Sequence, residues 1–157
     1  MTKAKSDGPK WEVRFSRIHG YGVFAAKPIR KGSRILEYTG ERITPDEASR
    51  RYDDEASDLA HVVLFTVDEK TVIDGGAGGG EARFVNHSCD PNCEAVARDG
   101  RIFIEALRAI APGEELTYDY RLELPGRHTR AVKARYPCLC GSPNCRGTLL
   151  LTKTGKR

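Results

Sequence analysis

Long apolar runs are absent from this chain of 157 residues, and no stretch approaches the roughly 20 apolar residues that a membrane-spanning helix needs. The basic first ten residues have no apolar segment behind them, so we expect neither a secretory signal nor membrane binding. With 39% hydrophobic and 31% charged residues, a disordered chain is also excluded. We expect one self-folding domain in a reducing compartment, cytoplasmic or nuclear, although host-directed secretion without a signal peptide stays open.

Acidic residues are scarce at both ends of the chain, and basic residues are scarce in its centre. Residues 1–34 carry nine Lys or Arg and two acids, residues 121–157 carry nine and one, and the span between carries eight and nineteen. The net charges are +7 and +8 at the ends and −11 in the centre. This pattern favours either an acidic groove for a basic partner or ordinary solvated faces. The basic C-terminal region leaves nucleic acid as a possible partner.

Secondary structure is predicted to be mainly β with short helices, an α+β class. The sequence Asp99-Gly100 predicts a two-residue hairpin turn. Thr44 as N-cap and Pro45 at the first helical position predict a helix from about Pro45 to Ser57. Short β-like runs predict strands at 11–15, 35–38, 62–67, 72–73, 94–97 and 102–107.

Two internal patterns are less specific. Residues 29–35 and 110–116 share an apolar residue, a Gly turn and a strand that ends in Tyr, but two copies are too few for a solenoid. Residues 75–80 are Gly-rich without the Lys-Ser/Thr ending of a phosphate loop. Such a permissive backbone indicates either a tight path or a nearby ligand.

The five cysteines are clustered and odd in number, which does not suit a disulfide scaffold. Cys138, Cys140 and Cys145 form C-x-C-x4-C in a turn with little apolar content. Because structural zinc takes four ligands, three local thiolates require a fourth from Cys89 or Cys93. The alternative is a set of buried free cysteines.

The densest polar motif runs from Arg83 to Asn92 and reads R-F-V-N-H-S-C-D-P-N. Its Arg, Asn and His side chains can hydrogen-bond a polar ligand or one another. His87 alone would more often be a structural histidine.

This motif resembles the signature of the SET-domain protein-lysine methyltransferases, R-F-x-N-H-S-C-x-P-N. Residues 19–24, 37–41 and 113–120 resemble, in the same order, the family's G-x-G, E-Y-x-G-E and G-E-E-L-T-Y-D-Y segments, and the cysteine cluster resembles its post-SET zinc segment. The resemblance covers about Trp11 to Leu151 and includes no cysteine-rich pre-SET region.

The resemblance implies a SET-domain β-clip fold with a C-terminal pseudoknot and a small zinc-bound post-SET segment. It divides the chain into a flexible tail (1–10), the SET domain (11–121), a linker (122–135), the post-SET segment (136–152) and a basic tail (153–157).

The resemblance also implies site residues. The catalytic tyrosine is Tyr120, with Tyr38 and Tyr118 in the same site. Cys89 becomes the fourth zinc ligand beside Cys138, Cys140 and Cys145. The co-substrate S-adenosylmethionine is expected to contact His19, Gly20, Tyr21, Gly22, Arg83, Asn86, His87 and Leu139. Gly80 and Val63 depart from the family pattern near the cofactor.

The implied reaction transfers a methyl group to a neutral lysine nitrogen of a protein or peptide, with a histone tail as one candidate and mono- or dimethylation favoured. Tyrosines suit it because their rings exclude water and their hydroxyls orient an amine. Without the motifs, the three tyrosines would be ordinary core aromatics. We expect a monomer. The alternatives are a non-catalytic family member or a zinc-containing module that binds peptide or nucleic acid.

Overall fold

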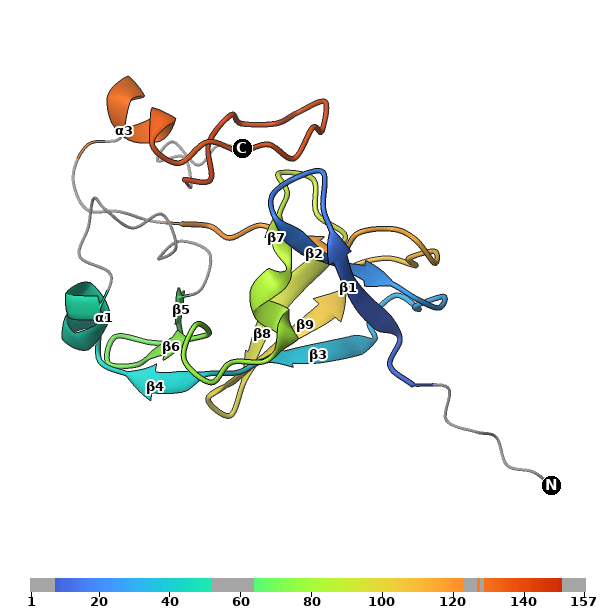
Figure 1. Ribbon diagram of the computed structural model, residues 1–157, viewed down its shortest axis with the longest axis horizontal. Coiled ribbons are helices and arrows are strands. Elements are labelled where there is room, and N and C mark those ends of the chain that lie inside the picture. Colours follow the sequence, from blue (N-terminus) through green and yellow to red (C-terminus); the bar gives the residue numbers. More distant parts are fainter. Residues whose placement is uncertain (1–7, 52–63, 123–126, 128, 151–157) are drawn as a thin grey trace.

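The computed structural model describes residues 8–51, 64–122, 127 and 129–150. Within them the strands form four small sheets and the helices are short, so the predicted mainly β architecture is confirmed (Figure 1). In chain order the elements are β1 (Trp11–Phe15), β2 (Tyr21–Ala25), β3 (Arg34–Tyr38), β4 (Glu41–Ile43), α1 (Pro45–Arg51), β5 (Leu64–Thr66), β6 (Val72–Asp74), the 3-10 turn η2 (Glu81–Phe84), β7 (Asn86–His87), β8 (Cys93–Arg98), β9 (Arg101–Ala106), β10 (Thr117–Tyr118) and α3 (Arg130–Ala134).

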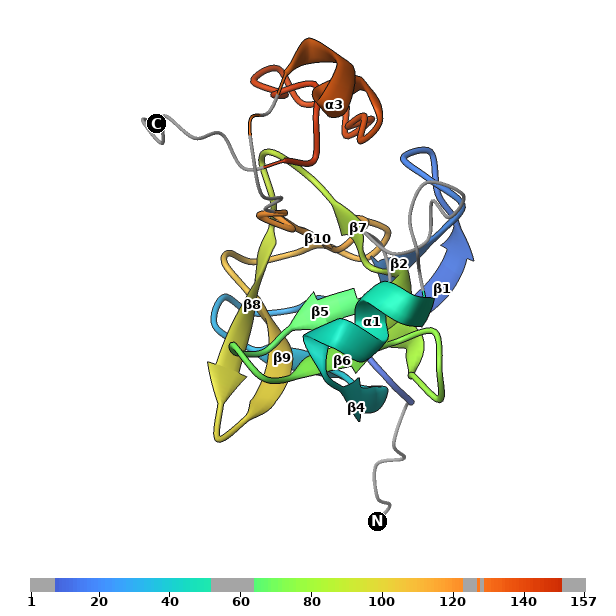
Figure 2. The same cartoon turned by 90° about the vertical axis from the view of Figure 1, so that its left-hand side faces the viewer.

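Two three-stranded antiparallel sheets and one hairpin form most of the structure. The sheets have the orders β3-β9-β8 and β4-β6-β5, and β1 and β2 form the hairpin. Two views at right angles show α1 beside β6 and the C-terminal segment at one end of the molecule (Figures 1 and 2). The outer strands, β3 and β8 in one sheet and β4 and β5 in the other, have no further strand paired to them within the described residues.

The turn between β8 and β9 is the predicted hairpin. Asp99 and Gly100 have φ values of 52° and 80°, both in the left-handed region, as a type I′ turn requires. The ladder runs from the Cys93–Ala106 pair to the Arg98–Arg101 pair at the turn. Strand β8 is therefore longer at both ends than predicted, because pairing to β9 continues beyond its apolar residues.

Helix α1 starts where the sequence predicts. The Glu47 amide donates to Thr44 Oγ1 at 3.1 Å, which caps the first turn. The predicted end of this helix at Ser57 and the first two residues of the predicted 62–67 strand lie outside the described residues, as does Val63.

The two similar segments noted in the sequence pair with each other. Ile29 and Ile110 exchange both backbone hydrogen bonds at 2.9 Å, and both side chains are buried. They belong to a core that also includes Val23, Ile104 and Leu116. The shared pattern thus reflects two equivalent turns that bury their apolar residues together.

A parallel pairing of two short strands brings distant motifs together. Asn86 of β7 lies opposite Thr117 of β10, and His87 lies opposite Tyr118. Neither strand was predicted, because two residues are too few to show an alternating pattern. The pairing sets the polar motif of residues 83–92 beside the tyrosines of residues 118–120.

The Gly-rich loop follows a tight path. A Cβ on Gly79 would collide with the backbone of Gly75, and the Gly80 amide donates to Thr39 Oγ1 at 3.0 Å. Close contact between backbone segments therefore supports the first interpretation of these glycines, a tight path of the chain.

Candidate active site and cysteine cluster

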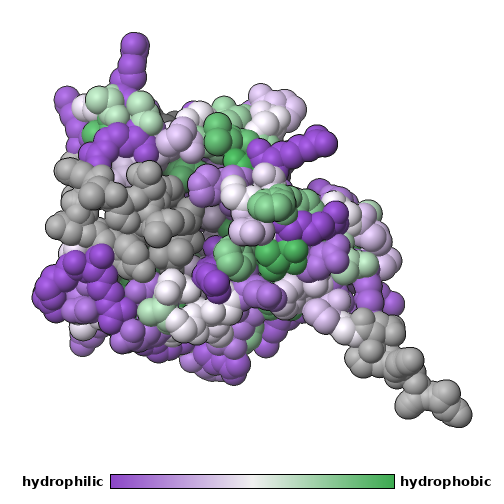
Figure 3. All heavy atoms as spheres, in the orientation of Figure 1, coloured by the Kyte–Doolittle hydropathy of each residue, from purple (hydrophilic) through white to green (hydrophobic). Residues whose placement is uncertain are grey.

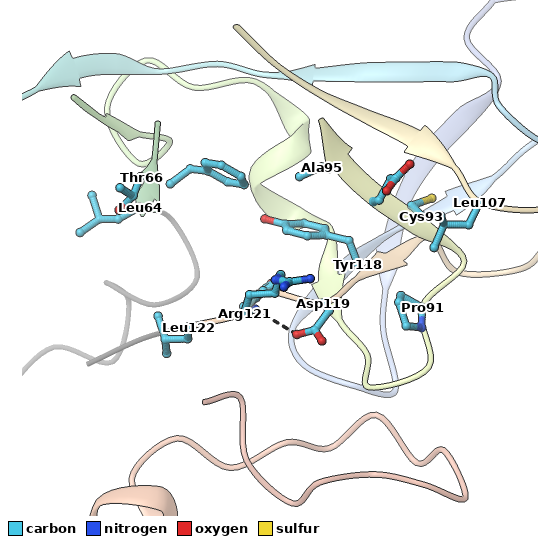
Figure 4. Close-up of a pocket in the computed structure, with 13 residues that line it drawn as sticks. Leu64, Thr66, Pro91, Cys93, Ala95, Leu107, Tyr118, Asp119, Arg121 and Leu122 are labelled. Atoms are coloured by element: carbon cyan, nitrogen blue, oxygen red, sulfur yellow. Dashed lines mark hydrogen bonds between the residues drawn. The ribbon is translucent and has the colours of Figure 1, made fainter. Parts of the chain in front are cut away.

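An aromatic cluster lies where β3, β5 and β10 meet. The Tyr118 ring centroid is 5.0 Å from that of Tyr120 and 6.3 Å from that of Phe65, which is 5.3 Å from that of Tyr38. Phe65, Tyr118 and Tyr120 line a cavity of about 770 Å³, and Figure 4 shows Tyr118 lying across it. Tyr38 is buried against Phe65 and is not among the residues that line the cavity.

The hydroxyls of the cavity tyrosines stay protonated. Burial raises the pKa of Tyr118 well above its usual value, and the neighbouring phenols Tyr120 and Tyr38 raise it further. Burial also raises the pKa of Tyr120, with Tyr38 and Glu115 adding to the effect. These groups can therefore donate and accept hydrogen bonds, but they do not act as phenolate bases near neutral pH.

Tyr120 is held at both ends. Its hydroxyl donates to the Val85 carbonyl at 2.7 Å, and its backbone amide donates to His87 Nδ1 at 3.0 Å. Because the hydroxyl proton is used by Val85, the oxygen lone pairs point away from that bond and remain available to another group.

His87 connects Tyr120 to the cysteines. Since Nδ1 accepts from Tyr120, Nε2 carries the proton, and it lies 3.4 Å from Cys89 Sγ. Burial lowers the pKa of His87 to about 4, with Asp119 opposing and Arg146 adding to the shift. The ring is therefore neutral and buried, and it serves as a connector between β10 and the cysteine cluster.

Asn86 holds the loop that carries the G-x-G segment. Its Nδ2 lies 3.1 Å from the carbonyl oxygens of His19 and Tyr21 and 2.9 Å from Glu115 Oε2. Asn86 therefore shapes the predicted cofactor loop by binding its backbone, and its side chain is buried.

Glu115 completes this arrangement and was missed by the sequence reasoning. It accepts from Ser16 Oγ at 2.8 Å as well as from Asn86, and a Cβ on Gly22 would collide with its carboxylate. Gly22 is thus required for the close approach of strand β2 to Glu115. The signal was present as the second Glu of the 113–120 motif, next to a buried Leu116, but sequence alone gives no partner for it.

Arg83 is also engaged with the backbone. Its Nη1 donates to the carbonyls of Gly79 and Gly80 at 3.0 and 2.8 Å, and its guanidinium lies 4.3 Å from the centroid of the Phe84 ring. Like Asn86 and His87, it fixes the local backbone in this structure.

Two exposed aromatic side chains stack at the G-x-G segment. Tyr21 is 48% exposed, and its ring stacks on that of Phe15 at 4.8 Å. Leu139, also among the predicted cofactor contacts, is 60% exposed. Figure 3 shows hydrophobic groups over the β1–β2 hairpin on a face that is otherwise largely hydrophilic. Exposed rings and a left-handed Gly20 with open space around it fit a ligand that carries a flat heterocycle.

The four predicted zinc ligands lie together. The Sγ atoms of Cys89, Cys138, Cys140 and Cys145 are all within 4.8 Å of one another, and Cys93 is not part of this group. Cys89 and Cys138 are 3.7 Å apart, close to the about 3.8 Å that a tetrahedral site with 2.3 Å zinc–sulfur bonds requires. The sulfur positions therefore fit a zinc ion.

Backbone amides reinforce this fit. The amides of Arg146, Cys140, Cys89 and Gly147 point at the sulfurs of Cys89, Cys138, Cys140 and Cys145, respectively, at 3.2 to 3.5 Å. Burial alone would raise the pKa of Cys140, but the amide of Cys89 and the hydroxyl of Ser142 outweigh it and lower the pKa to about 6. Donors aimed at every sulfur are what a thiolate cluster needs.

Cys93 has a different environment. It is fully buried on β8, and burial raises its pKa to about 12. The spacing argument had left Cys89 and Cys93 as alternatives, and only Cys89 lies with the other three.

In the part of the chain that the structure describes, seven of the nineteen acids of the centre are paired with arginine. Glu37, Glu41, Glu47, Asp74, Glu105, Glu114 and Asp119 each form an ion pair with at least one Arg. The cavity is lined by Glu94, Asp119 and Arg121, and Asp119 is already paired with Arg146. These pairs account for seven of the nineteen acids of the −11 region, so they do not decide between an acidic groove and solvated faces.

Three residues of the candidate site had no sequence signal of their own. In the sequence, Phe65 is only part of a β-like run, and Asp119 is only the residue between two tyrosines of a motif. Arg146 is one of many basic residues. Their importance comes from tertiary contacts that a single sequence does not encode.

Comparisons with known proteins agree with these motifs. Residues 20–121 match the family described as SET domain. The chain is 48% identical over 149 residues to "Histone-lysine N-methyltransferase, H3 lysine-4 specific" of Eremothecium gossypii and 46% identical over 147 residues to the protein of the same name from Saccharomyces cerevisiae, in both cases over 89% of this chain. It is 42% identical over 135 residues, 83% of this chain, to "Histone-lysine N-methyltransferase trr" of Drosophila melanogaster.

The relatives are much longer proteins. The chain spans 15%, 13% and 5% of their lengths. Among residues 8–51, 64–122, 127 and 129–150, no helix combines the length and the apolar character needed to cross a membrane.

Proposed function

The chain belongs to the SET-domain family, and we propose that it transfers a methyl group from S-adenosylmethionine to a lysine side chain of a protein. The observation that carries this proposal is the cavity lined by Phe65, Tyr118 and Tyr120, next to a loop held by Asn86 and Glu115. The names of the similar proteins support the same reaction.

S-adenosylmethionine, when bound, supplies an electrophilic methyl group on a sulfonium, and a neutral amine accepts it by direct displacement. Deprotonation of a lysine with a pKa of about 10.4 costs about 4 to 5 kcal/mol of free energy at pH 7. Aromatic walls lower this cost where they exclude water from the amine, because such surroundings disfavour the ammonium. The protonated phenols do not serve as the base, so we propose that the proton leaves to solvent.

Tyr120 is the proposed catalytic residue. Its hydroxyl is fixed on the Val85 carbonyl, which leaves its oxygen lone pairs free to stabilise an electron-poor methyl group. Tyr118 would orient the amine in the cavity, and Tyr38 supports Phe65 from behind.

The co-substrate contacts are proposed around the G-x-G loop. His19, Gly20, Tyr21 and Gly22 would offer backbone groups and the Tyr21 ring, with Leu139 covering the ligand from the C-terminal side. Arg83, Asn86 and His87 would act mainly by holding the backbone, as their hydrogen bonds in this structure indicate.

Zinc is proposed as a structural ion on Cys89, Cys138, Cys140 and Cys145. The sulfur spacing and the four N–H···S contacts support this ligand set. No open coordination position is needed, since four thiolates complete a tetrahedral site.

The names of the fungal relatives lead us to propose lysine 4 of histone H3 as the substrate and the nucleus as the location. Arg127, Arg130, Lys133 and Arg135 are exposed, and no side-chain partner is described for any of them. These cations around α3 support a secondary contact with nucleic acid. A monomer remains the expectation.

Labelled-methyl transfer from S-adenosylmethionine to an H3 tail peptide tests this function. We expect label on lysine 4, and Tyr120→Phe should lower kcat by roughly 10²–10³-fold with zinc content unchanged. A matched H3 peptide with Arg at position 4 is the control. Zinc-loaded protein that labels neither the peptide nor a proteome extract would favour the non-catalytic binding module instead.

A further inference from the structure

One arginine joins the cysteine cluster to the tyrosine motif. Arg146 follows Cys145, and its amide donates to Cys89 Sγ at 3.2 Å. Its side chain reaches out of the cluster and donates from Nη1 to Asp119 Oδ2 at 2.9 Å and from Nη2 to Asp119 Oδ1 at 3.2 Å. A single residue therefore contacts a proposed zinc ligand with its backbone and the 118–120 motif with its guanidinium.

Asp119 lies between Tyr118 and Tyr120 and also fixes the turn that follows. Its Oδ1 accepts from the Arg121 amide at 2.9 Å, the bond drawn as a dashed line in Figure 4. Arg121 has a φ of 52°, a left-handed conformation that costs free energy in a residue other than glycine. The carboxylate thus stabilises a strained backbone next to Tyr120.

The Arg146–Asp119 pair is strong for one near the surface. Its side chains are 20% and 24% exposed, and two parallel N–H···O bonds join them. Burial would raise the pKa of Asp119, but the bonds from Arg146 and the Arg121 amide outweigh it and lower the pKa. Among the residues that the structure describes, Arg146 Nε is buried without a hydrogen-bond partner, so the guanidinium is oriented for Asp119 at the expense of another bond.

We propose that Arg146 is a positioning residue that holds Tyr120 in its working position only when the cysteine cluster is folded. It acts through Asp119 and the Arg121 turn and does not touch the reacting atoms. The consequence for turnover rests on the proposed methyl transfer, whereas the coupling between the cluster and the turn does not.

Lysine cannot replace Arg146 in this role, because an ammonium cannot form the two-pronged contact. We expect zinc-loaded Arg146→Lys to lose about tenfold in kcat, the size of effect expected from one lost hydrogen bond to a charged group. KM for either substrate should change little, because Arg146 does not touch the reacting atoms. Asp119→Asn should have a similar effect. The double variant should lose no more than either single variant, because both changes break one link.

Arg108→Lys is the matched control. Arg108 pairs with Glu114 on the exposed surface and takes no part in the Arg146–Asp119 contact, so this substitution should leave kcat and KM unchanged. Zinc content is measured for every variant, which separates a positioning role from loss of the metal.

A readout independent of turnover is the solvent exchange of the Arg121 amide, followed by NMR. Exchange should accelerate in Arg146→Lys and Asp119→Asn at full zinc occupancy but not in Arg108→Lys. Unchanged exchange and unchanged kcat in Arg146→Lys would overturn the proposal, as would additive losses in the double variant. If the unmodified protein transfers no methyl group, the proposed function fails, and the exchange rates still decide the coupling.

Discussion

The two halves of the proposed site are stabilised in different ways. The tyrosine side is built on sheets whose core buries Val23, Ile104 and Leu116. The cysteine segment, residues 136–150, buries few apolar side chains, and helix α3 before it buries none. Burial of apolar surface therefore supports the first region, whereas the second depends on its thiolates. Active sites that join two such regions can lose one half without unfolding the other.

Metal removal should produce the largest difference in stability between the two regions. Structural zinc contributes about 10–16 kcal/mol in small zinc domains, so a chelator should unfold the cysteine segment and abolish methyl transfer. Far-UV circular dichroism should still report the β core. Elemental analysis should find one zinc per chain, lost in Cys89→Ser and kept in Cys93→Ser. Zinc-free protein with full activity would show that the two regions are independent.

A smaller effect should follow from loosening the tyrosine side alone. Glu115→Gln keeps the shape but removes the charge that binds Ser16 and Asn86. Hydrogen bonds to a charged group contribute about 1.5–3 kcal/mol, so S-adenosylmethionine should bind at least about tenfold more weakly by calorimetry. Zinc content should not change. Glu114→Gln, at the exposed neighbouring position, is the control. Equal affinity in both variants would contradict the role given to Glu115.

The sequence predicts some features of the tyrosine side and of the cysteine segment but not others. The hairpin at Asp99-Gly100 and the helix start at Pro45 follow from local chemistry, which neighbouring residues fully specify. The cysteine spacing likewise indicated a metal site. The fourth sulfur needed the family resemblance, because Cys89 and Cys93 differ only in tertiary position.

The remaining features depend on contacts between distant residues. Strands β7 and β10 have two residues each and carry no periodic signal. Glu115, Asp119 and Arg146 are charged residues whose partners lie far along the chain. A single sequence does not specify which of its many charges pair, so these residues were identified only in the structure.

The smallest predicted effect concerns the number of methyl groups. The Tyr118 hydroxyl occupies space in the cavity beside Tyr120, which hinders rotation of an already methylated nitrogen. Mono- or dimethyl-lysine should therefore dominate. Tyr118→Phe should shift the product to higher methylation, with the rate changed by about threefold or less.

Mass spectra of a single-lysine peptide at exhaustive reaction check this product distribution. Trimethyl-lysine as the main product of the unmodified protein would contradict it. An identical distribution for Tyr118→Phe would do the same.

The burial of Cys93 affects how the protein reacts with oxidants and alkylating reagents. All five cysteines lie in the described residues, and Cys93 is the one outside the cluster, where burial on β8 raises its pKa to about 12. Oxidants and alkylating reagents attack thiolates that they can reach, so Cys93 should react with both more slowly than the metal-free cluster thiols. Loss of zinc would expose four thiols at once, two of them with sulfurs only 3.7 Å apart. Thiol oxidation should therefore begin in the cysteine segment and at Cys89 rather than in the β core.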